Sequence, residues 1–176
     1  MSPVMQLAVE FGMTDNFDFA IYQVFSQNKT DGFRYRGFRL RGRYKIGEKD
    51  DFFIDPLLYF EYRGVPDFSK QGFEFKFILS KDIGHFNFTF NPMVEFEYEH
   101  EAEWLAAYTF GTSYMISELF GFGAEVKGSK YGHYAGPVIS HGNEHFWTTL
   151  GSQFKITEIL HDLPEFQIRL LLGILL

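Results

Sequence analysis

The sequence predicts an all-β protein, an antiparallel up-and-down β-barrel of about 10 to 12 strands that crosses a membrane. Three observations predict this fold. Apolar and polar residues alternate with period 2 along most of the 176 residues, and aromatic residues make up 20% of them. No window approaches the roughly 18 consecutive apolar residues that a membrane helix needs. The length suits one domain, so we expect residues 1–176 to form a single barrel.

The alternation is clearest over residues 86–99. The even positions are non-polar: Phe86, Phe88, Phe90, Pro92, Val94, Phe96 and Tyr98. The odd positions are polar apart from Met93, and they include three glutamates: Glu95, Glu97 and Glu99. Successive side chains point to opposite faces of a strand, so this segment has one apolar and one polar face.

The same pattern divides the chain into eleven strands. Their expected ranges are 4–12, 17–26, 33–46, 52–63, 72–80, 86–99, 103–116, 119–128, 133–140, 145–156 and 165–176. In the third range the apolar positions change from odd to even at Gly37, which predicts a β-bulge there. The polar face of this strand then carries a row of five arginines: Arg34, Arg36, Arg39, Arg41 and Arg43.

The connections between the predicted strands are of two alternating kinds. Short turns are expected at 14–16, 47–51, 81–85, 117–118 and 142–143. Longer or more polar connections are expected at 27–32, 64–71, 100–102, 129–132 and 158–164. This alternation is typical of the periplasmic turns and outer loops of outer-membrane barrels.

Alternation alone is also compatible with a water-soluble β-sandwich or a lipocalin-like barrel, whose apolar faces point inward. Three features favour lipid. The apolar faces are dominated by Phe, the polar faces carry charges of both signs, and many strands reach the about 9–11 residues that cross a bilayer. The mid-strand prolines Pro56, Pro92 and Pro137 are evidence against a closed barrel, because proline cannot donate a ladder hydrogen bond.

Two further sets of residues follow from this interpretation. Aromatic residues near strand ends are expected to form interfacial girdles: Tyr44, Tyr62, Tyr98, Trp104, Tyr114 and Tyr131. Acidic residues of the polar faces are expected to meet the arginine row of the third strand across a lumen: Glu61, Glu74, Glu95, Glu97 and Glu99.

Two segments resemble the small, porin-like outer-membrane β-barrel proteins of bacteria. Residues 10–17, Glu-Phe-Gly-Met-Thr-Asp-Asn-Phe, are similar to a strand–turn–strand of the Gly-Leu-Thr-Asp type common in such barrels. Residues 166–176 resemble the alternating terminal strand that the barrel-assembly machinery binds, although the chain closes on Leu176 rather than on an aromatic residue. The resemblance implies a multi-pass protein of the bacterial outer membrane, inserted by that machinery.

The resemblance also implies a periplasmic C-terminus, which would place residue 1 of an eleven-stranded chain on the outer side. Single-chain bacterial barrels usually have an even number of strands. We therefore expect ten or twelve: either one N-terminal strand is missing from this chain, or one predicted strand is split or merged. The first residues carry no signal peptide, so an exported protein would have lost or replaced it,.

Composition excludes several functions. The net charge of −7 with scattered basic residues gives no basis for nucleic-acid binding,. The chain has no cysteine, which excludes disulfides and thiolate metal sites,. The polar cluster from Ser140 to His145 resembles a Ser/His or His/Glu site, but polar turn residues explain it adequately. We expect no enzyme activity, catalytic residue, metal site or cofactor.

The leading functional hypothesis is a narrow channel or passive pore for small polar solutes or ions. The arginine row then forms either an anion-selective constriction or a structural filling that neutralises the acidic strands. The alternative is a non-conducting, charge-plugged barrel that binds an envelope partner or a second copy of itself. A membrane-embedded lipid-modifying enzyme is a weaker third hypothesis.

Overall fold

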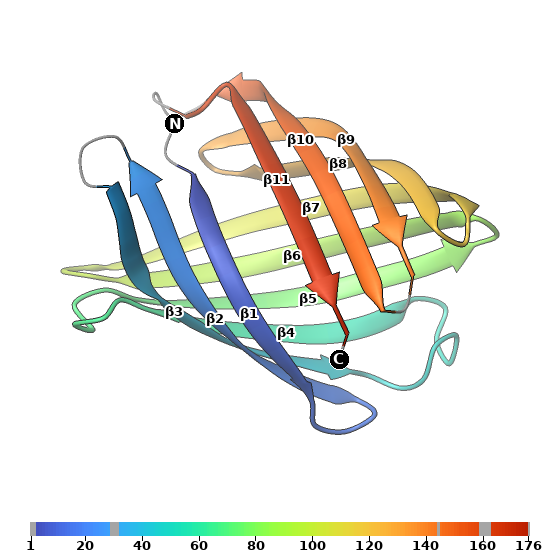
Figure 1. Cartoon of the computed structure of the whole chain (residues 1–176), viewed down its shortest axis with the longest axis horizontal. Coiled ribbons are helices and arrows are strands. Elements are labelled where there is room, and N and C mark those ends of the chain that lie inside the picture. Colours follow the sequence, from blue (N-terminus) through green and yellow to red (C-terminus); the bar gives the residue numbers. More distant parts are fainter. Residues whose placement is uncertain (1–2, 29–31, 144, 159–162, 176) are drawn as a thin grey trace. The chain divides into compact units, whose positions relative to one another are not determined.

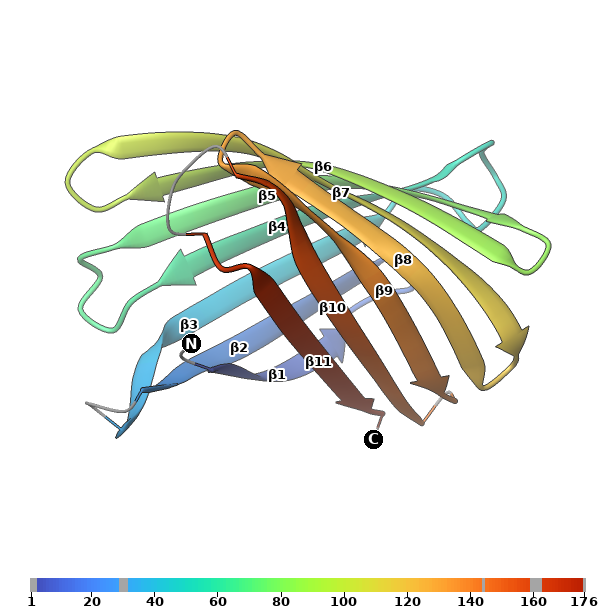
Figure 2. The same ribbon diagram turned by 90° about the horizontal axis from the view of Figure 1, so that it is seen from above.

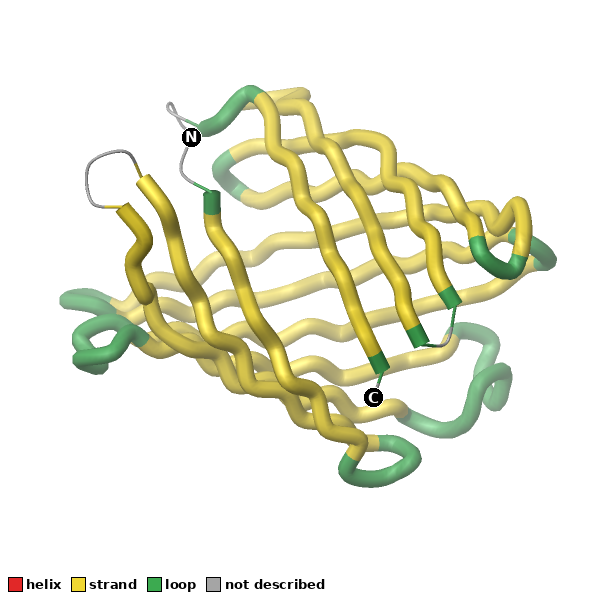
Figure 3. The backbone as a smooth tube through the Cα atoms, viewed as in Figure 1, coloured by secondary structure: helices red, strands yellow, loops and turns green. Residues whose placement is uncertain are grey.

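The computed structural model of the protein describes residues 3–28, 32–143, 145–158 and 163–175. The regular structure in this part of the chain consists of β-strands joined by turns and loops (Figure 3). Within the same residues, no helix is long and apolar enough to cross a membrane. The predicted all-β class is therefore confirmed.

Eleven strands are present in the described part of the chain. They are β1 (Val4–Gly12), β2 (Phe17–Asn28), β3 (Gly32–Lys45), β4 (Asp55–Gly64), β5 (Gln71–Ile83), β6 (Phe86–Tyr98), β7 (Ala102–Ser117), β8 (Phe120–Ser129), β9 (Gly132–Gly142), β10 (Phe146–Glu158) and β11 (Phe166–Ile174). They follow one another in sequence order in one sheet, each bonded to the next (Figure 1, Figure 2). This up-and-down antiparallel arrangement confirms the strand pattern read from the sequence.

The connection from β3 to β4 differs from its prediction as a short turn, because it runs from residue 46 to 54. Gly47 and Asp50 have positive φ angles of 74° and 68°, which turn the backbone away from the extended direction,. The Glu48 N–H donates to the Asp51 carboxylate at 2.8 Å, and the Asp50 N–H donates to Asp55 at 2.8 Å. These local bonds delay the start of β4, so short and long connections do not alternate strictly.

The predicted bulge in the third strand is confirmed at Gly37. The pairing of β2 with β3 shifts where Val24 faces Gly37 and Phe25 faces Tyr35, which leaves Arg36 as the extra residue. Gly37 has a φ of 144°, and a Cβ atom there would collide with the Gly64 carbonyl oxygen. Glycine is therefore required at this position by both conformation and space.

The structure accommodates two of the three strand prolines at weak points of the ladder. Pro56 is the second residue of β4, where its carbonyl accepts a bond from the Ile46 N–H. Pro137 pairs with Ala124 of β8. On its other side, the ladder between β9 and β10 has no residue pair between the pair Val138 and Gly151 and the pair Ala135 and Phe154, so Pro137 has no partner in β10. The missing N–H of Pro137 therefore removes no bond from a regular residue pair between β9 and β10. Pro92 lies inside β6.

The chain divides into two compact units. Unit 1 comprises Met1–Ile78 and Met93–Leu105, and unit 2 comprises Leu79–Pro92 and Ala106–Leu176. The boundary passes through β5, β6 and β7, so both units are built from antiparallel strands. Each unit is described separately below.

Burial in the described residues is inverted relative to an ordinary soluble domain. The buried apolar residues are Ala20 and Tyr134. The buried polar or charged residues are more numerous: Ser26, Arg41, Glu61, Glu74 and Gln153. Large apolar side chains on most strands are exposed. In β1 every residue is exposed, and Val4, Leu7 and Phe11 are among them. An apolar core, the usual source of stability in water, is therefore lacking in this part of the chain.

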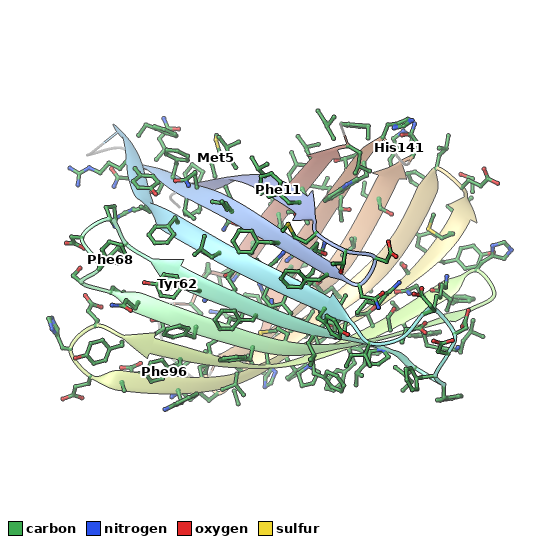
Figure 4. All side chains as sticks on the ribbon, turned by 90° about the horizontal axis from the view of Figure 1, so that it is seen from below. Met5, Phe11, Tyr62, Phe68, Phe96 and His141 are labelled. Atoms are coloured by element: carbon green, nitrogen blue, oxygen red, sulfur yellow. The ribbon has the colours of Figure 1, made fainter. Side chains whose placement is uncertain are left out.

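Aromatic rings of unit 1, exposed at Trp104 and half-buried at the other positions, contact one another from strand to strand. Phe38 packs on Tyr62, Tyr62 on Phe73, Phe73 on Phe96, and Phe96 on Trp104, with ring centroids 4.7 to 6.1 Å apart. Figure 4 shows Tyr62, Phe68 and Phe96 toward the same end of the unit 1 strands. Cross-strand aromatic pairs of this kind stabilise a sheet surface that carries no covering layer.

Candidate functional site: a charged face on unit 1

The antiparallel register of β1 to β4 aligns charged residues in a row across the sheet. Glu10 faces Ala20, Ala20 faces Arg41, and Arg41 faces Glu61. Directly paired residues share one face of a sheet, so these four side chains project from the same side. We call this side of unit 1 the charged face. Its small residue, Ala20, leaves room for Arg41 to reach across β2.

Arg41 is the most buried cation of the charged face, with 5% of its surface exposed. Its Nη2 atom lies 3.0 Å from both the Glu10 and the Asp18 carboxylates. Its Nη1 atom donates to the Tyr22 hydroxyl, and the guanidinium lies 5.5 Å from the Tyr22 ring centre. Two carboxylates and one phenol therefore compensate the burial of one positive charge.

Arg43 continues this cluster toward the β1–β2 turn. Its Nε atom donates to both oxygens of Asp18, at 3.0 and 2.9 Å, and its Nη2 atom lies 3.5 Å from Glu10. Arg41 and Arg43 thus share the same two carboxylates. The result is an ion-pair network that joins β1, β2 and β3 through side chains as well as through the backbone ladder.

A second cluster surrounds Glu61, which is 3% exposed. Its carboxylate accepts hydrogen bonds from Arg39 at 3.0 Å, Arg63 at 2.8 Å and the Tyr59 hydroxyl at 2.7 Å. Arg63 also contacts Glu74 and lies 3.0 Å from Glu95. One arginine therefore links carboxylates of β4, β5 and β6.

Lys70, in the connection between β4 and β5, extends the charged face to the strand ends. Its ammonium group lies 3.0 Å from Glu97 and 3.6 Å from Glu99. The hydrogen bond to Glu97 raises the pKa of Lys70, against a smaller opposing effect of burial. In the same connection, hydrogen bonds from the hydroxyl and N–H of Ser69 lower the pKa of Asp67. This connection is therefore held by local polar bonds.

The predicted arginine row is divided by the bulge. Arg39, Arg41 and Arg43 join the two clusters, whereas Arg36 donates from Nε to the Ser26 hydroxyl at 2.6 Å. Arg34 is exposed near the start of β3. Arg36 and the three arginines beyond the bulge therefore have different partners.

Each of the five predicted acidic residues lies beside a cation, and Glu61 contacts Arg39 of the third strand. Glu74 and Glu95 pair with Arg63 of β4, while Glu97 and Glu99 pair with Lys70. The reason is strand order: β4 and its following connection lie between β3 and these glutamates, and their cations are nearer.

Sequence reasoning also missed three residues of the site: Glu10, Asp18 and Arg63. All three occupy polar positions of the alternation. Counting outward from the Met13–Asn16 turn would have placed Glu10 opposite Ala20 and hence one strand away from Arg41. The Met13 and Thr14 N–H groups both donate to the Phe17 carbonyl in this turn, at 3.0 and 3.1 Å, which fixes that register.

A small cavity lies on unit 1 beside the Gly37 bulge, with a volume of about 160 Å³. Gly37, Gly64 and Gly72 contribute backbone without side chains. Its charged lining residues are Arg36, Arg39, Arg63, Lys70 and Glu97. Four of these five are basic, and the apolar residues Val24, Phe38 and Val65 complete the lining with the three glycines.

Unit 2 carries a smaller polar cluster around Glu125. Gln153 of β10 and Glu125 of β8 contact one another, and Arg169 of β11 lies 3.2 Å from the same carboxylate. The intervening residue, Gly136, faces Glu125 on β9. Lys127 donates to Gln167 at 2.7 Å, which again links β8 to β11. A small residue thus permits contacts across a strand here, as Ala20 does in unit 1.

The predicted girdle aromatics lie at strand ends or in a neighbouring connection. Tyr62 and Trp104 belong to the chain of aromatic rings in unit 1, and Tyr44 and Tyr98 are exposed. In unit 2, the Tyr114 ring contacts those of His85, Phe86 and Phe122, and Tyr131 lies between β8 and β9 near the Lys130 ammonium. These placements are compatible with the predicted girdle.

The described residues of the polar cluster from Ser140 to His145 occupy the end of β9 and the turn that follows it. Ser140 and His141 are consecutive residues of β9, so their side chains lie on opposite faces,. Asn143 accepts bonds from the N–H groups of His145 and Phe146, both at 2.9 Å, which is a turn-forming role. Glu144, like Leu176 at the chain end, lies outside the described residues. No group of three metal-binding side chains occurs in the residues that are described.

The chain matches no known protein-family model, and neither the curated proteins nor the solved structures contain a significant match to it. Its function must therefore be argued from the charged face, the exposed apolar surface and the strand pattern themselves.

Proposed function

We propose that this protein is a β-barrel of a bacterial outer membrane, inserted through the barrel-assembly machinery, that provides a narrow path for small polar solutes or ions. The observation that carries the proposal is the inverted burial: charged residues such as Arg41 and Glu61 are buried, while large apolar residues are exposed. This distribution suits a protein whose apolar side contacts acyl chains and whose polar side does not.

The alternative of a soluble β-protein is less well supported by this surface. Hydrophobic burial is the main force that stabilises folded proteins in water. Here Phe75, Phe88 and Phe122, on three different strands, are each exposed. Such residues cost nothing in lipid, whereas a large exposed apolar surface in water marks an interface or an aggregation hazard.

Strand length supports the same proposal. The shortest strands, β1 and β11, have 9 residues and the longest, β7, has 16. A tilted strand needs about 9–11 residues to cross the hydrocarbon layer. Every strand is therefore long enough to span it.

The charged face supports a path for polar solutes. Arg39, Arg43 and Arg63 keep 26 to 35% of their side-chain surface accessible, so water reaches them. Fixed, accessible charges on one face are what tune the selectivity of a polar lumen.

A non-conducting barrel is the second candidate, and one specific observation favours it. Arg41 and Arg63 each bind carboxylates from two or three strands. Salt bridges of this kind fill space and lock neighbouring strands together, as expected in a plugged barrel. In this case the exposed surfaces would serve a structural or partner-binding role in the envelope.

Two experiments test these proposals in order. The first compares the migration of the detergent-purified protein in SDS gels with and without boiling. A membrane barrel should show heat-modifiable migration and should precipitate without detergent, whereas a monodisperse protein in plain buffer would overturn the proposal. The second measures planar-bilayer conductance of the heat-modifiable form. Stepwise current supports the channel, and its absence from verified folded protein supports the plugged barrel.

A further inference from the structure

We propose that the cavity beside the Gly37 bulge is a binding site for a phosphate group, with Arg36 as its principal ligand. This goes beyond the proposed path for solutes, because it assigns an equilibrium binding site to residues of unit 1 alone. The site requires neither conduction nor a membrane to be tested.

The shape of the cavity comes from three glycines on three strands: Gly37 of β3, Gly64 of β4 and Gly72 of β5. A Cβ atom on Gly37 would collide with the Gly64 carbonyl, so these two backbones approach closely. The absence of side chains leaves about 160 Å³, which is room for several water molecules or for one small oxyanion,.

Basic side chains outnumber acidic ones in the lining of the cavity. Arg36, Arg39, Arg63 and Lys70 line it, against Glu97 as the acidic residue of the lining. Arg39 and Arg63 bind Glu61, and Lys70 binds Glu97, so these three cations have carboxylate partners. Arg63 also contacts Glu74 and Glu95, and Lys70 also contacts Glu99, so the charge available to a ligand in this lining is that of Arg36.

Arg36 differs from the other three cations of the lining. Its partner in the described structure is the neutral hydroxyl of Ser26, which binds Nε at 2.6 Å. Ser26 is itself buried whereas Arg36 is exposed, so this bond restrains the planar guanidinium at Nε and leaves its other edge toward solvent. The two Nη groups remain available to donate to a ligand, and two parallel N–H donors match two oxygens of a phosphate.

The position of Arg36 in the sequence explains why this residue is available. It is the extra residue of the bulge, between the pairs Val24–Gly37 and Phe25–Tyr35. Bulges redirect a side chain from the regular alternation of its strand. The contact of Arg36 is with Ser26 of β2, whereas Arg39, Arg41 and Arg43 contact carboxylates.

The test is calorimetric titration of the detergent-purified full chain with inorganic phosphate at constant ionic strength. Arg36→Gln should weaken phosphate binding by at least about tenfold, the loss expected for charge-assisted hydrogen bonds. The matched control is Arg34→Gln, which removes the same charge from the same strand outside the cavity and should change affinity by less than about twofold. Equal effects of both variants, or no phosphate binding by the unmodified protein, would overturn the proposal.

Two additions keep the result interpretable. Arg36→Lys retains the charge but lacks the planar fork, so it should bind phosphate about threefold or more weakly, and wild-type affinity in this variant would contradict the bidentate role. It also replaces Arg36→Gln if that variant does not fold.

Titration with sn-glycerol 3-phosphate and acetate identifies the source of the phosphate group. Tighter binding of the glycerol ester indicates a lipid headgroup, equal binding indicates free phosphate, and tighter acetate binding contradicts a phosphate site.

Discussion

The guanidinium of Arg41 on β3 lies 3.0 Å from the carboxylate of Glu10 on β1, so one ion pair spans the whole width of β2. The β2 residue beneath it is Ala20, which is fully buried. A larger side chain at this position would occupy the space that the guanidinium crosses. The ion pair between Arg41 and Glu10 therefore depends on the small side chain of Ala20, which lies on the strand between them.

Arg41→Gln should destabilise the folded protein by about 1–3 kcal/mol, because it removes one of the two cations that Glu10 and Asp18 share and leaves Arg43 alone to compensate both carboxylates,. The loss is smaller than for a fully buried pair, since both carboxylates remain partly accessible to water,. Urea unfolding in detergent measures it. Combining Arg41→Gln with Glu10→Gln should restore part of the loss. Strict additivity of the two changes would show that the pair is not coupled.

Gly37→Ala should destabilise the protein by roughly 1–3 kcal/mol, because the new Cβ collides with the Gly64 carbonyl and the residue has a φ of 144°,. Gly12→Ala is the control, since a Cβ atom at Gly12 meets nothing within 4 Å. For both variants, the measurement is the temperature at which the protein in SDS changes from the migration of its folded form to that of its unfolded form. Equal midpoints for the two would mean that the bulge does not need glycine.

Removing the Lys70 ammonium should make stability less sensitive to alkaline pH. Its pKa is raised in the folded state by the hydrogen bond to Glu97, so its contribution is complete below its ordinary pKa of 10.5 and is lost as the pH rises through the higher folded value,. The pair is largely exposed, so the contribution is at most about 1 kcal/mol.

The measurement is the free energy of unfolding between about pH 8 and about pH 12, a range that brackets the ordinary lysine pKa of about 10.4, for the unmodified protein and Lys70→Gln. The two curves should be separated at the lower end and converge at the upper end. Lys130→Gln, which removes a charge from the connection between β8 and β9, serves as the control. A separation that stays constant over the whole range would contradict the role of Lys70.

If the charged face lines a conducting path, Arg39→Glu combined with Arg43→Glu should shift its selectivity toward cations. Both arginines are partly accessible to water, so their charges act on ions near the face. Reversal potentials in a salt gradient measure the shift. Lys130→Glu, outside the charged face, should leave selectivity unchanged, and the same shift in that control would remove the face from the path.

The sequence predicts the strands well because alternation is a local property. All eleven strands lie close to their expected ranges, and the bulge was predicted from a change of phase at Gly37. The start of β4 was missed because the turn around Gly47 and Asp50 is stabilised by local hydrogen bonds that period 2 does not reveal.

The partners within the charged face were harder to predict. Alternation assigns a residue to a face, but the register between strands decides which charges meet. Arg63 binds Glu74 and Glu95 but was not predicted, because it is a single arginine on β4 whereas the third strand carries five. The connection from β4 to β5 spans residues 65–70 and was not one of the predicted short turns, so the register that brings Arg63 beside Glu74 could not be counted from it.

The central claim is that the apolar side of the strands contacts lipid, and the absence of cysteine from the chain allows a direct test. Single cysteines replace Asn87, Phe88, Thr89 and Phe90 of β6, each carries a fluorophore, and each variant is reconstituted into vesicles of brominated lipid. Phe88 and Phe90 are exposed, whereas Asn87 and Thr89 bond to Ser80 on the polar side. Quenching should be strong at 88 and 90 and weak at 87 and 89. Uniform or reversed quenching would contradict the account.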